Sequence, residues 1–276
     1  MKKLITSIVL FISLGIILAA CGGEEGSSDP NTIKVGASSV PHAEILEQAK
    51  PILEEQGITL EIEEYEDYVL PNDDLANGEI DANYFQHIPY LEQTIEDTGY
   101  DLDYIDGIHI EPMGVYSKGI SSLEAIPEGT EVVMSNAVAD HGRVLSLFEK
   151  NGLIKLDENV KKAEATIDDI TENPKNLKFS PDYGPAMLPD FYESDENALV
   201  VINTNYAIGA GLNPLEDSLM VEDEDSPYVN VVAVKAENKD NEALNKLVEV
   251  LHSDEIQQFM EEEYGGAVVP VSGNQK

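Results

Sequence analysis

A single cysteine, Cys21, limits how this 276-residue chain can be stabilised. Without a second cysteine no intramolecular disulfide can form, whichever compartment the chain occupies. The folded part must therefore depend on the burial of apolar side chains in a packed core. The length is sufficient for two domains.

The first 20 residues have the order of an export signal. Lys2 and Lys3 precede an apolar run over residues 4–20, which ends in small residues directly before Cys21. Such a segment is removed on export, and bacterial lipoprotein processing attaches diacylglycerol to a cysteine at the cleavage site. We therefore expect residues 1–20 to be a lipoprotein signal peptide and Cys21 to hold the protein at the extracytoplasmic face of the cell membrane. A transmembrane anchor is the alternative, but the run is shorter than the roughly 20 residues that span a bilayer.

Acidic side chains dominate the rest of the chain. Once Lys2 and Lys3 are removed with the signal, 14 basic side chains remain against 54 acidic ones. Nucleic-acid binding requires clustered Lys and Arg, so this composition argues against it. Residues 22–31 contain no apolar side chain, and we expect residues 21–31 to be a flexible tether.

From residue 32 onwards, short β-branched runs alternate with amphipathic segments. This alternation predicts an α/β fold with a largely parallel sheet, in which ligands bind at the carboxyl ends of the strands. The expected strands are 32–37, 59–65, 80–85, 131–134, 199–203 and 229–235. The expected helices are 42–56, 142–150, 167–173 and 241–251.

Arg143 is the only arginine among 16 basic residues. Its planar guanidinium can hold a carboxylate with two parallel hydrogen bonds, which a lysine cannot do. A position near a helix N-terminus would add free backbone amides and the helix dipole to such a site. The alternative is an ordinary surface ion pair on a helix that Asp140 would cap.

Six ring side chains occur within 26 positions of a chain that has no tryptophan. Some of them must belong to the core. Asn72, Asn83 and Gln86 interleave with them, however, and a purely apolar interior would leave these amides without hydrogen bonds. An aromatic slot with a few polar groups is the usual composition of a small-molecule site. The six rings are Tyr65, Tyr68, Tyr84, Phe85, His87 and Tyr90.

Five motifs occur in the order of one known family. They are DYVLPN at 67–72, DANYFQH at 81–87, PYL at 89–91, VINTNYA at 201–207 and SPYVN at 226–230. Together they resemble the methionine-binding lipoproteins of bacterial ABC importers, the NlpA family, over nearly all of residues 32–269. The resemblance implies a two-lobed periplasmic-binding-protein fold, with a mixed sheet flanked by helices in each lobe and the ligand in the cleft. Lobe 1 would comprise 32–112 and 229–276, and lobe 2 would comprise 113–228.

The resemblance also implies a function. The chain would capture methionine or a close analogue and deliver it to the permease and ATPase of an importer, without catalysis and without a cofactor. Methionine needs a cation for its carboxylate, acceptors for its ammonium group and a dry aromatic slot for its thioether. The ligand-binding residues that the resemblance implies are Tyr68, Phe85, His87, Tyr90, Asn136, Asp140, Arg143, Asn203 and Asn230.

One segment departs from the family's pattern. Residues 136–143 read NAVADHGR, whereas the family usually reads NDPTNxxR. Asn136 and Arg143 are kept, and Asp140 replaces an asparagine that faces the ligand in the family. Asp140 could pair with the ligand's ammonium group, cap the helix or indicate a different ligand, and the residues leave these alternatives open.

Two other classes of function are alternatives to an amino-acid carrier. A metal-binding lipoprotein of an ABC importer would use histidines with a carboxylate to hold Zn²⁺ or Mn²⁺. The chain has four candidate histidines, but no two of them show the close sequence spacing that is typical of metal ligands. An extracellular enzyme is the other class, yet the chain contains no G-x-S-x-G, H-E-x-x-H or Walker motif, and His87 has no evident nucleophile partner. The histidines concerned are His42, His87, His109 and His141.

We predict that Cys21→Ser moves the protein from the membrane fraction to the medium or to an unprocessed precursor, without loss of the fold. The physical reason is that the acyl chains on one cysteine supply the membrane affinity, at about 0.8 kcal/mol per buried methylene. Detergent-phase partitioning of the variant and the wild type measures this. Unchanged partitioning would contradict the lipid-anchor interpretation.

Overall fold

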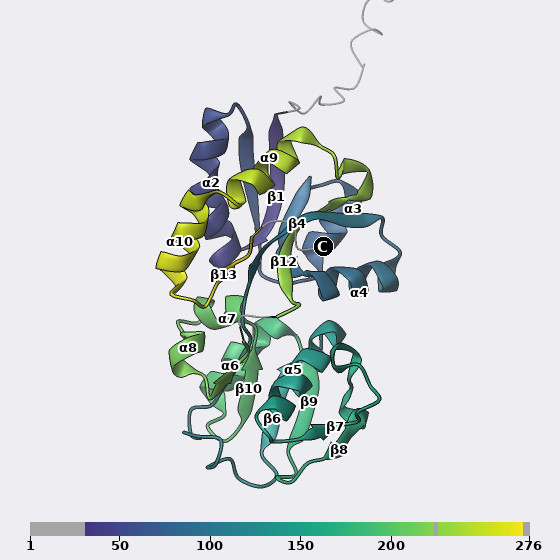
Figure 1. Ribbon diagram of the computed structural model, residues 1–276, viewed down its shortest axis with the longest axis vertical. Coiled ribbons are helices and arrows are strands. Elements are labelled where there is room, and N and C mark those ends of the chain that lie inside the picture. Colours follow the sequence, from purple (N-terminus) through teal and green to yellow (C-terminus); the bar gives the residue numbers. More distant parts are fainter. Residues whose placement is uncertain (1–30, 224–225, 273–276) are drawn as a thin grey trace, which may run out of the picture. The chain divides into compact units, whose positions relative to one another are not determined.

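Two β-sheets, each covered by helices on both faces, form most of the chain (Figure 1). The computed structural model describes residues 31–223 and 226–272. The predicted export signal, Cys21 and the tether up to residue 30 lie outside these residues. Within the described ranges, no helix is long and apolar enough to cross a membrane.

The first sheet has six strands in the order β13-β4-β12-β3-β1-β2. Strand β1 pairs in parallel with β2 and β3, whereas β12 runs antiparallel between β3 and β4. The sheet is therefore mixed and not largely parallel, because β12 returns from the second lobe in the opposite direction. The strands are β1 Thr32–Ser38, β2 Thr59–Tyr65, β3 Ala82–His87, β4 Leu102–Ile110, β12 Val229–Lys235 and β13 Val269–Pro270.

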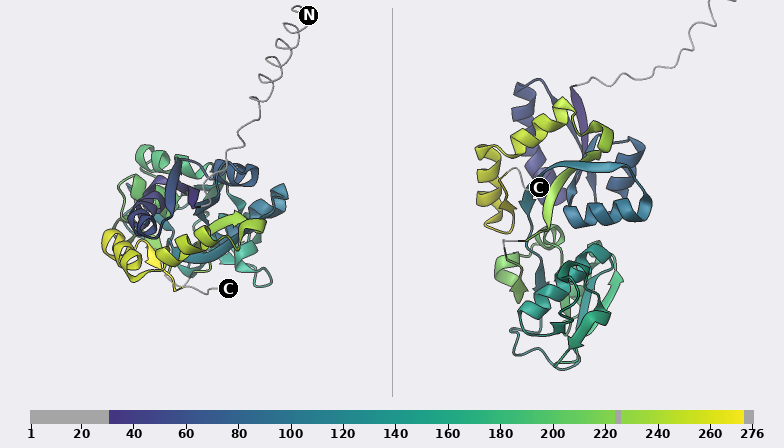
Figure 2. Two further views of the ribbon diagram at one scale, coloured as in Figure 1. Left: turned by 90° about the horizontal axis from the view of Figure 1, so that it is seen from above. Right: turned by 45° about the vertical axis from the view of Figure 1, so that its right-hand side comes forward.

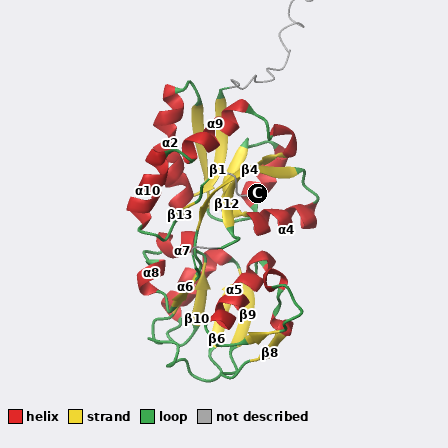
Figure 3. Cartoon of the chain, in the orientation of Figure 1, coloured by secondary structure: helices red, strands yellow, loops and turns green. Residues whose placement is uncertain are grey.

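Helices cover both faces of this sheet, as the two views of Figure 2 and the colouring of Figure 3 show. Helices α2, α9 and α10 pack on one face, and α3 and α4 pack on the other. Every residue of β3 is buried for this reason, as is typical of a strand covered on both sides. The helices are α2 Glu44–Glu55, α3 Leu70–Asn77, α4 Ile88–Thr98, α9 Glu242–Leu251 and α10 Asp254–Tyr264.

The second sheet has five strands in the order β11-β5-β10-β6-β9. Helix α5 packs on one face, and α6 and α7 pack on the other. A separate two-stranded sheet, β7 with β8, lies beside α5. The strands are β5 Gly114–Tyr116, β6 Glu131–Ser135, β7 Lys155–Leu156, β8 Ile170–Glu172, β9 Lys178–Tyr183, β10 Leu199–Ile202 and β11 Met220–Val221. The helices are α5 Val138–Lys150, α6 Leu188–Ser194, α7 Thr204–Gly209 and α8 Pro214–Asp217.

The chain passes between the two sheets twice. Residues 111–113, the first crossover, join β4 to β5. The second crossover lies between β11 and β12 and is described at residues 222–223 and 226–228. We call the six-stranded sheet with its helices lobe 1, and the five-stranded sheet with its helices lobe 2. The exact boundaries between the lobes stay a prediction.

Most expected elements are present, with two differences. The segment expected as a helix over 42–56 begins as a π-helical turn, Ser39–Ala43, and continues as α2 with Pro51 inside it. The helix expected over 167–173 is wrong, because a short 3-10 turn at Ile167–Asp169 is followed by strand β8. Thr166 and Asp169 form a capping box there, so the start of a helix is present, but pairing with β7 then holds the backbone extended.

We predict that Gly142→Ala destabilises the protein by about 1–3 kcal/mol, the usual cost of overpacking. Gly142 lies in α5, and an added Cβ would come within 2.4 Å of the carbonyl oxygens of Lys162 and Ala163. The same change elsewhere in a helix stabilises by roughly 0.5–1 kcal/mol. Urea unfolding measures the difference. Gly209→Ala, at the end of α7 with nothing within 4 Å of its Cβ, is the matched control, and wild-type stability of the Gly142 variant would contradict this packing.

Candidate functional site

A small cavity of about 20 Å³ lies between the two lobes. Eight of the nine predicted ligand-binding residues line it, and so do four residues outside that predicted set: Gln86, Glu111, Thr204 and Asn205. Asn136 does not line this cavity, because it follows β6 and lines a neighbouring pocket beyond Tyr68 and Tyr90. The eight residues are Tyr68, Phe85, His87, Tyr90, Asp140, Arg143, Asn203 and Asn230.

Aromatic rings from lobe 1 form one wall of the cavity. The ring of Tyr68 lies 5.7 Å from that of Phe85 and 5.8 Å from that of Tyr90, between ring centroids. The Tyr68 hydroxyl donates to Asn205 Oδ1 of lobe 2 at 2.6 Å. The wall is therefore apolar over its rings and is tied to the opposite lobe at one hydroxyl.

The interleaved amides beside these rings bind one another. Asn72 Nδ2 donates to Gln86 Oε1 at 2.9 Å, Asn83 Nδ2 donates to Asn72 Oδ1 at 2.9 Å, and Gln86 Nε2 donates to Asn83 Oδ1 at 2.8 Å. All three residues are buried. This closed network explains how three amides can lie in an apolar region. Of the three residues, only Gln86 lines the cavity.

Asp140 is the third residue of α5 and is 1% exposed. His87 Nε2 lies 3.1 Å from Asp140 Oδ1, and Asn203 Nδ2 donates to Asp140 Oδ2 at 3.1 Å. The hydrogen bond to His87 joins lobe 1 to lobe 2. Burial raises the pKa of Asp140, but the hydrogen bond from His87 and the nearby charges lower it further, so the pKa lies below its ordinary value. The capping alternative is wrong, because Ala137 is the N-cap residue and no side chain caps this helix.

Arg143 lies one turn further along α5 and is 5% exposed, so the alternative of a surface ion pair is wrong. Its Nε and Nη2 lie 2.8 Å and 2.6 Å from Glu222 Oε2, and Nη2 also donates to the Glu111 carbonyl at 2.7 Å. The Tyr228 ring covers the guanidinium at 4.5 Å. Burial lowers the pKa of Arg143, but the Glu222 carboxylate outweighs it and keeps the group charged.

The guanidinium is therefore oriented differently from the expected two-bond grip. Nε and Nη2 of Arg143 bind protein oxygens, and no acceptor among the described residues binds Nη1. Of the five N–H groups of an arginine, those on Nη1 remain for a molecule in the cavity. Sequence reasoning missed Glu222, which lies in an acidic run that resembles any solvent-exposed segment.

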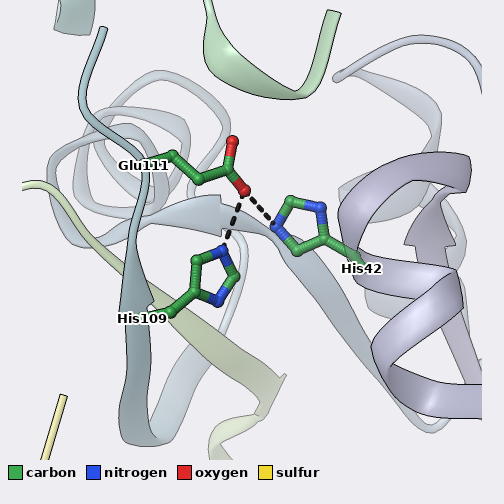
Figure 4. Close-up of side chains that lie close together, drawn as sticks. All are labelled: His42, His109 and Glu111. Atoms are coloured by element: carbon green, nitrogen blue, oxygen red, sulfur yellow. Dashed lines mark hydrogen bonds and ion pairs between the residues drawn. The ribbon is translucent and has the colours of Figure 1, made fainter. Parts of the chain in front are cut away.

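Glu111, in the first crossover, binds groups from both lobes, and Figure 4 shows its carboxylate with the two histidines of lobe 1. Its Oε1 lies 3.2 Å from His42 Nε2 and 2.8 Å from His109 Nε2, and its Oε2 accepts from the Asn205 backbone N–H at 3.1 Å. Burial lowers the pKa of His42 to about 4, so this ring is neutral at physiological pH. Burial raises the pKa of Glu111, but His42, His109 and Arg143 lower it further, so it stays below its ordinary value.

The four histidines of the metal-carrier alternative do not come together. His42 and His109 share Glu111, whereas His87 binds Asp140 and His141 Nε2 binds the Ser135 carbonyl oxygen. The second ring nitrogens of His42 and His109 bind the hydroxyls of Ser38 and Tyr84. Every ring nitrogen of this cluster thus has a partner in the protein, and the cluster needs no metal ion to satisfy it.

One buried acceptor in the cavity lacks a partner. Asn203 Oδ1 is shielded from solvent and accepts no hydrogen bond from any group in the described residues. Asn203 follows β10 and forms the N-cap position of α7. A buried polar atom without a partner is costly, so this oxygen indicates a donor on a bound molecule.

We predict that Glu222→Gln lowers the free energy of unfolding by about 3 kcal/mol, as is usual when one partner of a buried ion pair is removed. Glu222 Oε2 binds Arg143 and also accepts from the Met113 N–H at 3.0 Å. Asp223→Asn is the matched control, because Asp223 pairs with Lys150 at the surface, where such pairs contribute about 0–1 kcal/mol. Urea unfolding of both variants measures this, and equal losses would show that the Arg143 pair is not a buried one.

Comparison with known proteins gives consistent matches over the whole described part. The family model described as NlpA lipoprotein matches residues 33–272. The methionine-binding lipoprotein MetQ of Bacillus subtilis (strain 168) is 45% identical over 99% of this chain and 100% of its own length.

Solved structures agree with this match. A nutrient-binding protein from Burkholderia cenocepacia bound to methionine has a TM-score of 0.81 and 37% identity, covering 86% of this chain and 99% of its own. An ABC-transporter periplasmic substrate-binding protein from Coxiella burnetii has a TM-score of 0.81 and 38% identity, covering 87% of this chain and 100% of its own. The family model spans most of the chain and the similar proteins cover nearly all of it, and therefore this chain belongs to the NlpA lipoprotein family.

Proposed function

We propose that this chain is a substrate-binding lipoprotein that captures methionine, or a close analogue, outside the cell and delivers it to an ABC importer. Its role is binding and hand-over, with no catalytic step. Cys21 carries the lipid that holds the protein at the membrane, and the two lobes divide at 32–112 with 229–276 and at 113–228. The names of similar proteins support the ligand and the transporter.

The observation that carries this proposal is the composition of the cavity between the lobes. A cation, Arg143, and an anion, Asp140, line it together with the rings of Tyr68, Phe85 and Tyr90. An α-amino acid needs both charges, and an apolar side chain needs the rings. Pockets for small molecules combine apolar walls with a few placed polar groups in this way.

The thioether of methionine suits the aromatic wall. Sulfur in contact with ring edges contributes roughly 0.3–1.5 kcal/mol, and three rings converge here from β3, α4 and the segment before α3. The adjacent pocket, which Asn136 lines, borders Tyr68 and Tyr90 from the other side. We place Asn136 at the rim of the site, and the other eight predicted residues at the ligand.

The ligand carboxylate is expected at Nη1 of Arg143. This nitrogen is the part of the guanidinium that no described acceptor binds, and Arg143 lines the cavity. Because Glu222 fixes the other edge, the guanidinium does not have to be ordered when the ligand binds. Preorganisation of this kind reduces the entropy cost of binding.

We predict that L-methionine at about 100 times its dissociation constant stabilises the protein by roughly 2.7 kcal/mol, if it binds only the folded state. For a chain of this length the corresponding rise in Tm is roughly 5–10 °C. Leucine, which lacks the thioether, should give a much smaller shift, and Zn²⁺ should give none. Thermal unfolding with each compound measures this, and a shift with Zn²⁺ but with no amino acid would support the metal carrier instead.

A further inference from the structure

We propose that Asp140 makes a free α-ammonium group obligatory for ligands of this cavity, so that the site takes α-amino acids and rejects 2-hydroxy acids and N-acylated amino acids with the same side chain. The inference rests on the proposed function, since it concerns how that ligand is selected. It makes Asp140 the residue that determines this specificity.

His87 and Asn203 each bind one carboxylate oxygen of Asp140. His87 is the N-cap residue of α4, and its Nδ1 accepts from the Tyr90 backbone N–H at 3.2 Å. Because Nδ1 accepts this bond, Nε2, which faces Asp140, is the ring's donor toward the carboxylate. Asn203 is a neutral amide.

The one cation that lines the cavity is already paired. Arg143 binds Glu222, and no ion pair within 4.0 Å joins it to Asp140 in the part of the chain that is described. Asp140 is 1% exposed, and its two hydrogen bonds come from an imidazole and an amide. Burial of an ionised carboxylate is costly, and an ammonium group that binds it directly would reduce that cost.

A second acceptor lies beside Asp140. Asn203 Nδ2 donates to Asp140 Oδ2, and Oδ1 of the same amide is the buried oxygen without a partner. An ammonium group has three N–H donors and can bind both acceptors at once. A hydroxyl has one donor and no charge, and an acylated nitrogen has one donor and added bulk, so neither can bind both acceptors at once or neutralise the carboxylate.

The spacing of the charged residues matches an α-amino acid. Asp140 and Arg143 are three positions apart on α5 and both line the cavity, so they lie on one face of the helix. The ammonium and carboxylate groups of an α-amino acid are likewise fixed on one carbon atom. One helix turn thus presents an anion and a cation to neighbouring groups of opposite charge.

The test compares L-methionine, L-2-hydroxy-4-(methylthio)butanoate and N-acetyl-L-methionine by calorimetric titration of the full chain in detergent. We expect the wild type to bind methionine at least 100-fold more tightly than either analogue. In Asp140→Asn the ratio of the dissociation constant of the hydroxy acid to that of methionine should fall at least tenfold. The reason is that the amide no longer repels an anion that lacks an ammonium group. Asp190→Asn is the control, since Asp190 is also the third residue of a lobe 2 helix but is exposed, and its ratios should match the wild type.

The possible results separate this inference from the proposed function. If the wild type binds methionine and binds the hydroxy acid with an affinity within tenfold of that for methionine, the inference is overturned but the proposed function is not. This comparison uses the wild type only and does not depend on the folding of a variant. A ratio in Asp140→Asn that stays within threefold of the wild type would overturn it as well. If no α-amino acid binds the wild type, the proposed function fails too.

Discussion

The carboxylate of Glu111 is bound from both lobes at once, and the geometry of the cavity depends on this junction. Two imidazoles of lobe 1 bind one oxygen, and the N-terminal amide of α7 in lobe 2 binds the other. The carbonyl of the same residue accepts from Arg143. A change in the angle between the lobes must therefore move the acceptors that orient Arg143. The crossover and the ligand site are one hydrogen-bonded structure.

Much of the cavity could be predicted because its residues occur in short motifs. Phe85 and His87 lie two positions apart in β3, and Asn203 directly follows β10, so local sequence places them at strand ends. The partners of Arg143 could not be found in this way. Glu222 is 79 positions away, and nothing local distinguishes it among 54 acidic side chains. Long-range ion pairs in an acidic chain leave no sequence pattern.

Two differences between prediction and structure have the same physical origin. The alternation of strands and helices indicated a parallel sheet, but the direction of β12 depends on its return through the second crossover. The lone arginine was predicted to hold a ligand carboxylate with two hydrogen bonds, but the sequence could not show that most of its N–H groups face protein oxygens. Periodicity describes which face is buried, and it does not describe what the buried face meets.

The position of β12 also sets an order for assembly during synthesis. All strands of lobe 2 are complete by residue 221, whereas the middle of lobe 1 waits for residues 229–235, which pair with both β3 and β4. Until that segment emerges, β3 and β4 each present an unpaired edge, the kind of surface that joins other chains. Pairing across such sequence distances is slow. The nascent chain should therefore form its second lobe first, and complete its first lobe only when nearly all of it has emerged.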